Sequence, residues 1–240
     1  MNLLTVSSDA KTKKGEASGY LTGILYLLPH TLGGGYNLCP SSTPECRTVC
    51  LNTAGRLAMA ASHKAKERRT KLFLEDRAMF MTMLRGDIAA VRQKAHSKGL
   101  TPCFRLNGTS DISWENVKID VMNIMESEPG VQFYDYTKVW HRMRRWLEGK
   151  MPANYHLTFS RSEQNRRDAQ AVLRSGGNVA VVFRGGLPEE WDGHRVISGD
   201  DNDLRFLDPS PVIVGLTAKG KARRLGDGFV VETGREVASE

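Results

Sequence analysis

The spacing of apolar residues changes along the chain between a strand-like and a helix-like pattern. Short runs rich in β-branched and aromatic residues predict strands at 21–28, 103–107, 131–136, 155–160, 179–183, 195–198 and 212–216. Apolar residues at three- and four-residue spacing predict two helices between 54 and 98, and further helices over 114–126, 138–149 and 163–175. Strands that alternate with helices indicate parallel pairing through right-handed crossovers.

Within the predicted strands, apolar and polar residues alternate. Phe104 and Leu106 alternate with Cys103, Arg105 and Asn107, and the run 155–160 repeats the pattern. One face of the sheet therefore suits a layer of helices, whereas the other is polar and needs partners if it is buried. The pattern predicts an α/β fold, a partial or distorted (β/α) barrel of mostly parallel strands with a polar cavity inside. An antiparallel sheet with one wet face is the alternative.

Length and charge narrow the class of protein. The 240 residues fit a single barrel-like domain over 1–240. The apolar run 20–29 is about half of what a bilayer crossing needs, and the first residues lack the pattern of an export signal, so we expect a cytoplasmic protein without a membrane partner. The net charge of +7 and basic runs at 63–71, 142–145 and 219–224 allow nucleic acid as a partner, although each run is also typical of a solvated face.

The strongest candidate for chemistry is a cysteine motif that follows the first predicted strand. Cys39, Cys46 and Cys50 form a C-x6-C-x3-C pattern inside a loop over 30–56, and no second cysteine pair of the kind found in zinc ribbons accompanies them. We expect these thiolates to bind a [4Fe-4S] cluster, with zinc or free thiols as alternatives. Three ligands leave one iron open for a small-molecule cofactor or substrate. Cys103 is the candidate for a fourth ligand.

Ligands of parallel α/β folds lie at the carboxyl ends of the strands, where several polar residues occur. Candidate binding residues there are Asn107, Ser110, Asp111, Tyr136 and Ser160. Each has an ordinary alternative, because Asp and Ser cap helices and tyrosines pack in cores. The acidic run 200–208 contains Arg205, which favours an internal ion-pair network over a cation site, and His156 is the one histidine placed on the polar face.

Longer motifs resemble known families. The segments NLCPSSTPECRTVCLNTAGR, RLNGTSDISWE, QFYDYTK and GDDNDLRFLDP are similar to the gene product eighty-eight family of phages and mobile elements, which implies the cytoplasm of a phage host. A cysteine loop after the first strand also resembles the layout of radical S-adenosylmethionine enzymes, although their usual spacing differs. That second resemblance implies S-adenosylmethionine on the open iron. The alternative function is a nonenzymatic binding protein, held together by its metal, that engages nucleic acid or a host protein.

Overall fold

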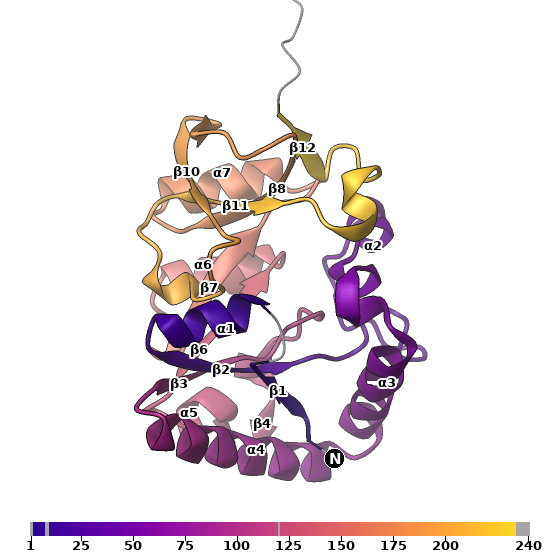
Figure 1. The fold of residues 1–240 in the computed structure, drawn as a ribbon, viewed down its shortest axis with the longest axis vertical. Coiled ribbons are helices and arrows are strands. Elements are labelled where there is room, and N and C mark those ends of the chain that lie inside the picture. Colours follow the sequence, from indigo (N-terminus) through magenta and orange to yellow (C-terminus); the bar gives the residue numbers. More distant parts are fainter. Residues whose placement is uncertain (1, 8–9, 120, 234–240) are drawn as a thin grey trace, which may run out of the picture.

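The computed structural model describes residues 2–7, 10–119 and 121–233, and a single large sheet organises them (Figure 1). Ten strands form this sheet in the order β1-β2-β3-β6-β7-β8-β11-β10-β9, with β12 paired to β8 beyond the end of β7. The strands are β1 (Leu4–Val6), β2 (Tyr20–Leu25), β3 (Thr101–Arg105), β6 (Gln132–Thr137), β7 (Tyr155–Ser160), β8 (Val179–Arg184), β9 (Glu190–Trp191), β10 (His194–Ser198), β11 (Ile213–Thr217) and β12 (Val230–Glu232). The prediction of a mostly parallel α/β sheet is therefore confirmed.

The predicted barrel is not confirmed, because the sheet is open. Its two edge strands, β1 and β9, run antiparallel to their neighbours β2 and β10 and do not pair with each other. At each edge of the sheet, the antiparallel strand ends the series of parallel strands. The first predicted strand is also the second of the structure, since the three-residue β1 precedes it and was too short to be recognised from the sequence.

Helices link successive strands of the sheet. They are α1 (Ala10–Ala17), α2 (Pro44–Thr48), α3 (Ala60–Glu75), α4 (Arg77–Ser97), α5 (Ile124–Ser127), α6 (Trp140–Leu147) and α7 (Arg166–Arg174), with short 3-10 turns η1 (Leu51–Thr53), η2 (Gly55–Ala58), η3 (Trp114–Asn116), η4 (Arg205–Leu207) and η5 (Gly220–Arg223). The main core forms where α4, α6 and α7 pack on the sheet, and it includes Phe104, Phe133, Leu157, Phe159 and Val181. These alternate positions confirm the predicted apolar face.

One predicted helix is wrong. Among its described residues, the segment 114–126 forms the turn η3, a short hairpin of β4 (Lys118–Ile119) and β5 (Met122–Asn123), and the start of the four-residue α5. The β-branched residues at 117, 119 and 121 favour extended backbone. Asn123 then starts α5 late, because its side chain and Glu126 form a capping box.

The second face of the sheet is covered in part by the connection between β10 and β11. This connection, residues 199–212, places Leu204 against Cys103 and Tyr134, and the ring of Phe206 lies 5.3 Å from that of Tyr20. The helix α1 packs beside it on β2. The predicted polar face is therefore buried rather than open to solvent.

Candidate functional site

The three cysteines of the motif lie in the long connection between β2 and α3, which passes over the carboxyl ends of the parallel strands. Cys39 Sγ accepts a hydrogen bond from the His30 amide at 3.3 Å and lies 3.7 Å from the carbonyl of Thr109, just beyond β3. The Asp111 amide donates to the Leu38 carbonyl at 2.8 Å. These contacts fix Cys39 against the end of β3.

The part of the loop that carries Cys46 is bound by Glu163, in the segment that follows β7. Thr43 caps α2 by accepting from the Cys46 amide, and the Thr43 hydroxyl donates to Glu163 at 2.9 Å. The same carboxylate accepts from the Glu45 amide at 3.3 Å. A negative charge at the start of a helix is favourable, so Glu163, three residues beyond β7, holds the loop to the sheet.

All four cysteines are free thiols, and the three of the motif are partly buried. Burial raises the pKa of the Cys39 thiol to about 12, and burial likewise raises the pKa of Cys50. Cys39 and Cys50 are near enough for charge on one to raise the pKa of the other, and Cys46 acts on Cys50 in the same way. The buried thiols are therefore protonated and unreactive at neutral pH unless a metal or another cation replaces their protons.

Lys138 is a cation whose charge acts on two of the motif cysteines. It follows β6, its Nζ donates to the Ser160 hydroxyl at 2.8 Å, and it lies 5.3 Å from the centre of the Phe229 ring. Its charge lowers the pKa of both Cys39 and Cys50 against the larger effect of burial. The charge of Lys66 in α3 also lowers the pKa of Cys50, and this lysine is itself buried, donating to Asn52 and to the Leu57 carbonyl.

The metal centre predicted from the motif is not formed in the described part of the chain. No group of three or more His, Cys, Asp or Glu side chains there is arranged to hold a metal ion, so Cys39, Cys46 and Cys50 do not converge as a cluster. Cys103 lies outside the loop, within β3, where its thiol is 3.3 Å from the hydroxyl of Thr22 and packs with Tyr134 and Leu204. The three motif cysteines share an edge of the sheet, but they are not a preformed cage.

Of the predicted binding residues, three belong to a buried network at the end of β3. The Asn107 Oδ1 accepts from Ser110, from the Ile112 amide and from Trp114 at 2.9–3.2 Å. Asp111 accepts from the Lys138 amide at 2.9 Å and pairs with Arg142 at 2.7 Å. Their polar groups bind other parts of the chain and give the edge its shape. Gly108 allows the backbone of this segment to approach Leu25 closely, since an added Cβ would lie 2.8 Å from the Leu25 carbonyl.

The other two predicted residues lie on the second face. Ser160 accepts the hydrogen bond from Lys138, and Tyr136 stacks under the guanidinium of Arg105 at 4.7 Å with a buried hydroxyl that has no hydrogen-bond partner. Tyr136 precedes Lys138 by two residues, so both point from the same face of β6. The structure thus separates the five predicted residues into two groups on opposite faces.

Sequence reasoning missed Arg142, the centre of the buried network. The basic run 142–145 is typical of a solvated face, yet the Arg142 side chain is fully buried and donates to Glu115 at 2.9 Å and to the Tyr155 hydroxyl at 2.8 Å. The signal was its spacing, because Arg142 lies three residues after Val139 on the buried side of α6. Lys66 was missed for the same reason, since it shares the buried side of α3 with Thr70 and Phe73.

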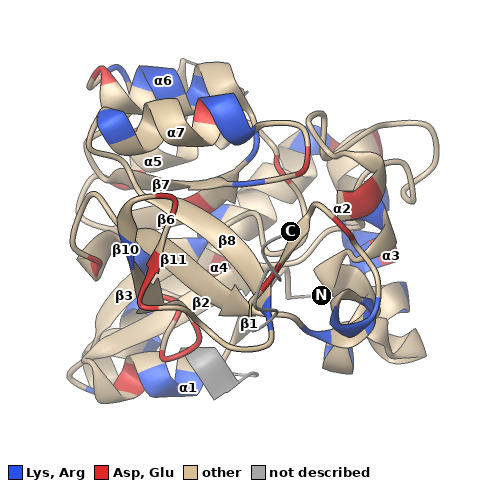
Figure 2. Ribbon diagram, turned by 90° about the horizontal axis from the view of Figure 1, so that it is seen from above, with Lys and Arg blue, Asp and Glu red and all other residues tan. Residues whose placement is uncertain are grey.

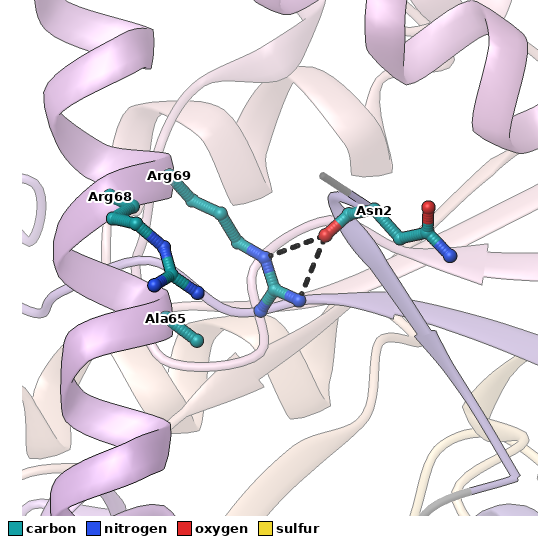
Figure 3. Close-up of a pocket in the computed structure, with 4 residues that line it drawn as sticks. All are labelled: Asn2, Ala65, Arg68 and Arg69. Atoms are coloured by element: carbon teal, nitrogen blue, oxygen red, sulfur yellow. Dashed lines mark hydrogen bonds between the residues drawn. The ribbon is translucent and has the colours of Figure 1, made fainter.

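Surface hollows lie apart from the cysteine loop. One of about 480 Å³ is lined by Asn2, Ala65, Arg68 and Arg69, and Figure 3 shows Arg69 directed at the Asn2 carbonyl, to which it donates two hydrogen bonds. Another of about 520 Å³ lies at the opposite end of the parallel strands, between α4 and residues 100–102 and 130. Lys and Arg positions, coloured blue in Figure 2, occur along α1, α3, α6 and α7. Along the described residues, no helix has the length and apolar character to cross a membrane.

These features define an α/β protein with an open, mostly parallel sheet and a cysteine-bearing loop across its carboxyl edge. Residues 2–232 match the family model of gene product 88, so the chain belongs to the gene product 88 family, as the motifs predicted. Comparison with curated proteins and with solved structures finds no match. The resemblance to radical S-adenosylmethionine enzymes is not supported by any of these comparisons.

Proposed function

We propose that this protein binds an iron–sulfur cluster through Cys39, Cys46 and Cys50. The observation that carries the proposal is that one loop brings three free, partly buried thiols to the carboxyl edge of a parallel sheet, within electrostatic reach of one another. Soft thiolate ligands select zinc, copper(I) and iron–sulfur clusters. The thiols must lose their protons and draw together when the cluster binds, because they do not form a metal-holding group beforehand.

The surroundings suit a negatively charged cluster. Three deprotonated cysteines carry three negative charges, and a buried negative charge needs a nearby cation or hydrogen-bond donors. Lys138 and Lys66 are cations whose charges lower the pKa of Cys50, and the His30 amide already donates to Cys39. A cluster with three cysteine ligands leaves one iron available to a cofactor such as S-adenosylmethionine or to a substrate.

The test is anaerobic reconstitution with ferrous iron and sulfide, followed by iron and sulfide analysis and a visible absorption spectrum. We expect the wild-type chain to take up both elements, and Cys39→Ser, Cys46→Ser and Cys50→Ser each to lose most of the bound iron, because serine is a harder and weaker ligand. Cys103→Ser is the matched control, since Cys103 lies in β3 beside Thr22. Circular dichroism should show that all four variants fold.

Four outcomes would separate this proposal from its rivals. A wild-type chain that takes up no iron, or a Cys103→Ser variant that loses as much iron as Cys46→Ser, contradicts the proposal. Zinc in place of iron after anaerobic purification would favour the metal-held binding protein. For the enzymatic form of the proposal, the spectrum of the reconstituted chain should change on addition of S-adenosylmethionine, and an unchanged spectrum rejects that form alone.

A further inference from the structure

A group of buried polar atoms on the second face of the sheet lacks hydrogen-bond partners. Within the described residues these atoms are Arg105 Nε, Tyr136 Oη, His156 Nε2, Thr158 Oγ1, Arg205 Nε and Nη1, and Asp208 Oδ2; one further such atom, Arg161 Nε, belongs to a guanidinium beside Trp191 and is not part of this group. Arg205 Nη1 and Asp208 Oδ2 form an ion pair at 3.1 Å, although not with the geometry of a hydrogen bond. We call these six residues the buried polar cluster. An unsatisfied buried polar group is costly, so several in one place indicate a missing partner.

The cluster surrounds one region of the fold. Tyr136 of β6 and Thr158 of β7 occupy paired positions, and the Arg105 guanidinium lies 4.7 Å from the Tyr136 ring centre. Burial, followed by the charge of Arg205, lowers the pKa of His156 to about 4, so Arg205 faces the same strand. Thr158 and Arg205 are 0% and 1% exposed. The unpartnered atoms therefore come from three adjacent strands and from the segment that crosses them.

The β10–β11 connection closes this region from solvent. Asp203 pairs with Arg105 at 2.9 Å, and Phe206 packs against Tyr134 with ring centres 5.4 Å apart. Tyr136 and Thr158 precede Lys138 and Ser160 by two residues each, so the same face continues toward the cysteine loop. The cluster is enclosed below the carboxyl edge, where ligands of parallel sheets bind.

The unpartnered atoms are mainly donors. The arginines contribute three donor nitrogens, Tyr136 and Thr158 contribute hydroxyls, and Asp208 Oδ2 is an acceptor when ionised. Asp203 and Asp208 balance the charges of the two arginines. We propose that the buried polar cluster binds a small carboxylic acid that also carries an amino or hydroxyl group. The guanidinium and hydroxyl donors would bind its carboxylate, and Asp208 would accept from its amino or hydroxyl group.

The buried polar cluster does not depend on the proposed iron–sulfur cluster, so its ligand binding is tested on the metal-free full chain. The probes are glycine, L-serine, L-lactate and acetate, followed by ligand-observed NMR and calorimetry at neutral pH. We expect at least one probe that bears both groups to bind more tightly than acetate, which lacks the second group. Thr158→Val should weaken that binding by about tenfold or more, because a hydrogen bond to a charged group is lost without a change of shape.

Two further variants keep the test decisive. Tyr136→Phe should weaken binding in the same way and serves if Thr158→Val does not fold. Thr82→Val, on the exposed side of α4, should leave binding unchanged. The proposal is overturned if none of the probes binds the wild-type chain, or if neither Thr158→Val nor Tyr136→Phe weakens binding. If Thr158→Val loses thermal stability and no probe binds, ordered water instead of a ligand would be the partner of the buried polar cluster.

Discussion

Arg142→Met should lower the free energy of unfolding by about 3–5 kcal/mol, because it leaves buried carboxylates without their cation. The Arg142 guanidinium is fully buried and donates to Glu115 twice at 2.9 Å and to Asp111 at 2.7 Å. Methionine has a similar length and is apolar, so the loss comes from charge and hydrogen bonds more than from a cavity. Urea unfolding followed by circular dichroism measures the change.

Two controls separate the buried network from a general effect of removing a cation from α6. Arg144→Met, whose side chain is 60% exposed and pairs with Glu148, should change stability by only a few tenths of a kcal/mol. Adding Glu115→Gln to Arg142→Met should recover part of the loss, since one uncompensated charge is then gone. An Arg142→Met variant within 1 kcal/mol of wild type, on the order of an exposed pair, would contradict the assignment.

The same variant reports on the cysteine loop. Asp111 links Arg142 to the Lys138 amide and, through its own amide, to the Leu38 carbonyl next to Cys39. If Arg142→Met still folds, its loop should exchange amide hydrogens faster than in wild type, because the segment that anchors Cys39 has lost a fixed partner. Native-state hydrogen exchange at Leu38 and Asp111 measures this.

The fold was predictable where a local pattern decides structure. Alternation in 155–160 identified both the strand β7 and its apolar face, because a period of two is a property of the strand itself. The open sheet was not predictable, since the end of a sheet depends on which distant strands pair. The short antiparallel strands β1 and β9 that occupy its edges carry too few residues for a pattern.

The candidate site was predictable to the same extent. The cysteine motif located a loop that the structure places at the carboxyl edge, whereas the arrangement of its thiols depends on contacts with Thr109 and Glu163, which are 70 and 118–120 positions away in the sequence. Arg142 shows the limit most clearly. Its carboxylate partners and the Tyr155 hydroxyl come from residues 13–31 positions distant, so its burial follows from tertiary packing rather than from the basic run that contains it.

Asp135 should make the protein less stable as pH rises from about 4 to about 7. Its side chain is fully buried in β6, and burial raises its pKa from 3.8 to about 7, against the opposing effect of hydrogen bonds from Asn107 and Tyr155. Below pH 4 the carboxyl is protonated in both the folded and the unfolded chain. Between the two pKa values the unfolded chain releases the proton while the folded chain retains it, so unfolding becomes more favourable, by at most about 4 kcal/mol in total.

The measurement is the free energy of unfolding in urea across this pH window for wild type and Asp135→Asn. His156 acts in the opposite direction, because burial lowers its pKa to about 4 and the unfolded chain then binds a proton that the folded chain does not. The wild-type curve alone therefore mixes both effects, whereas the difference between wild type and Asp135→Asn isolates the carboxyl. We expect that difference to change in favour of the variant as pH rises. Asp227→Asn, at a side chain 96% exposed, should give a curve parallel to wild type, and a parallel curve for Asp135→Asn would show that Asp135 ionises normally in the folded chain.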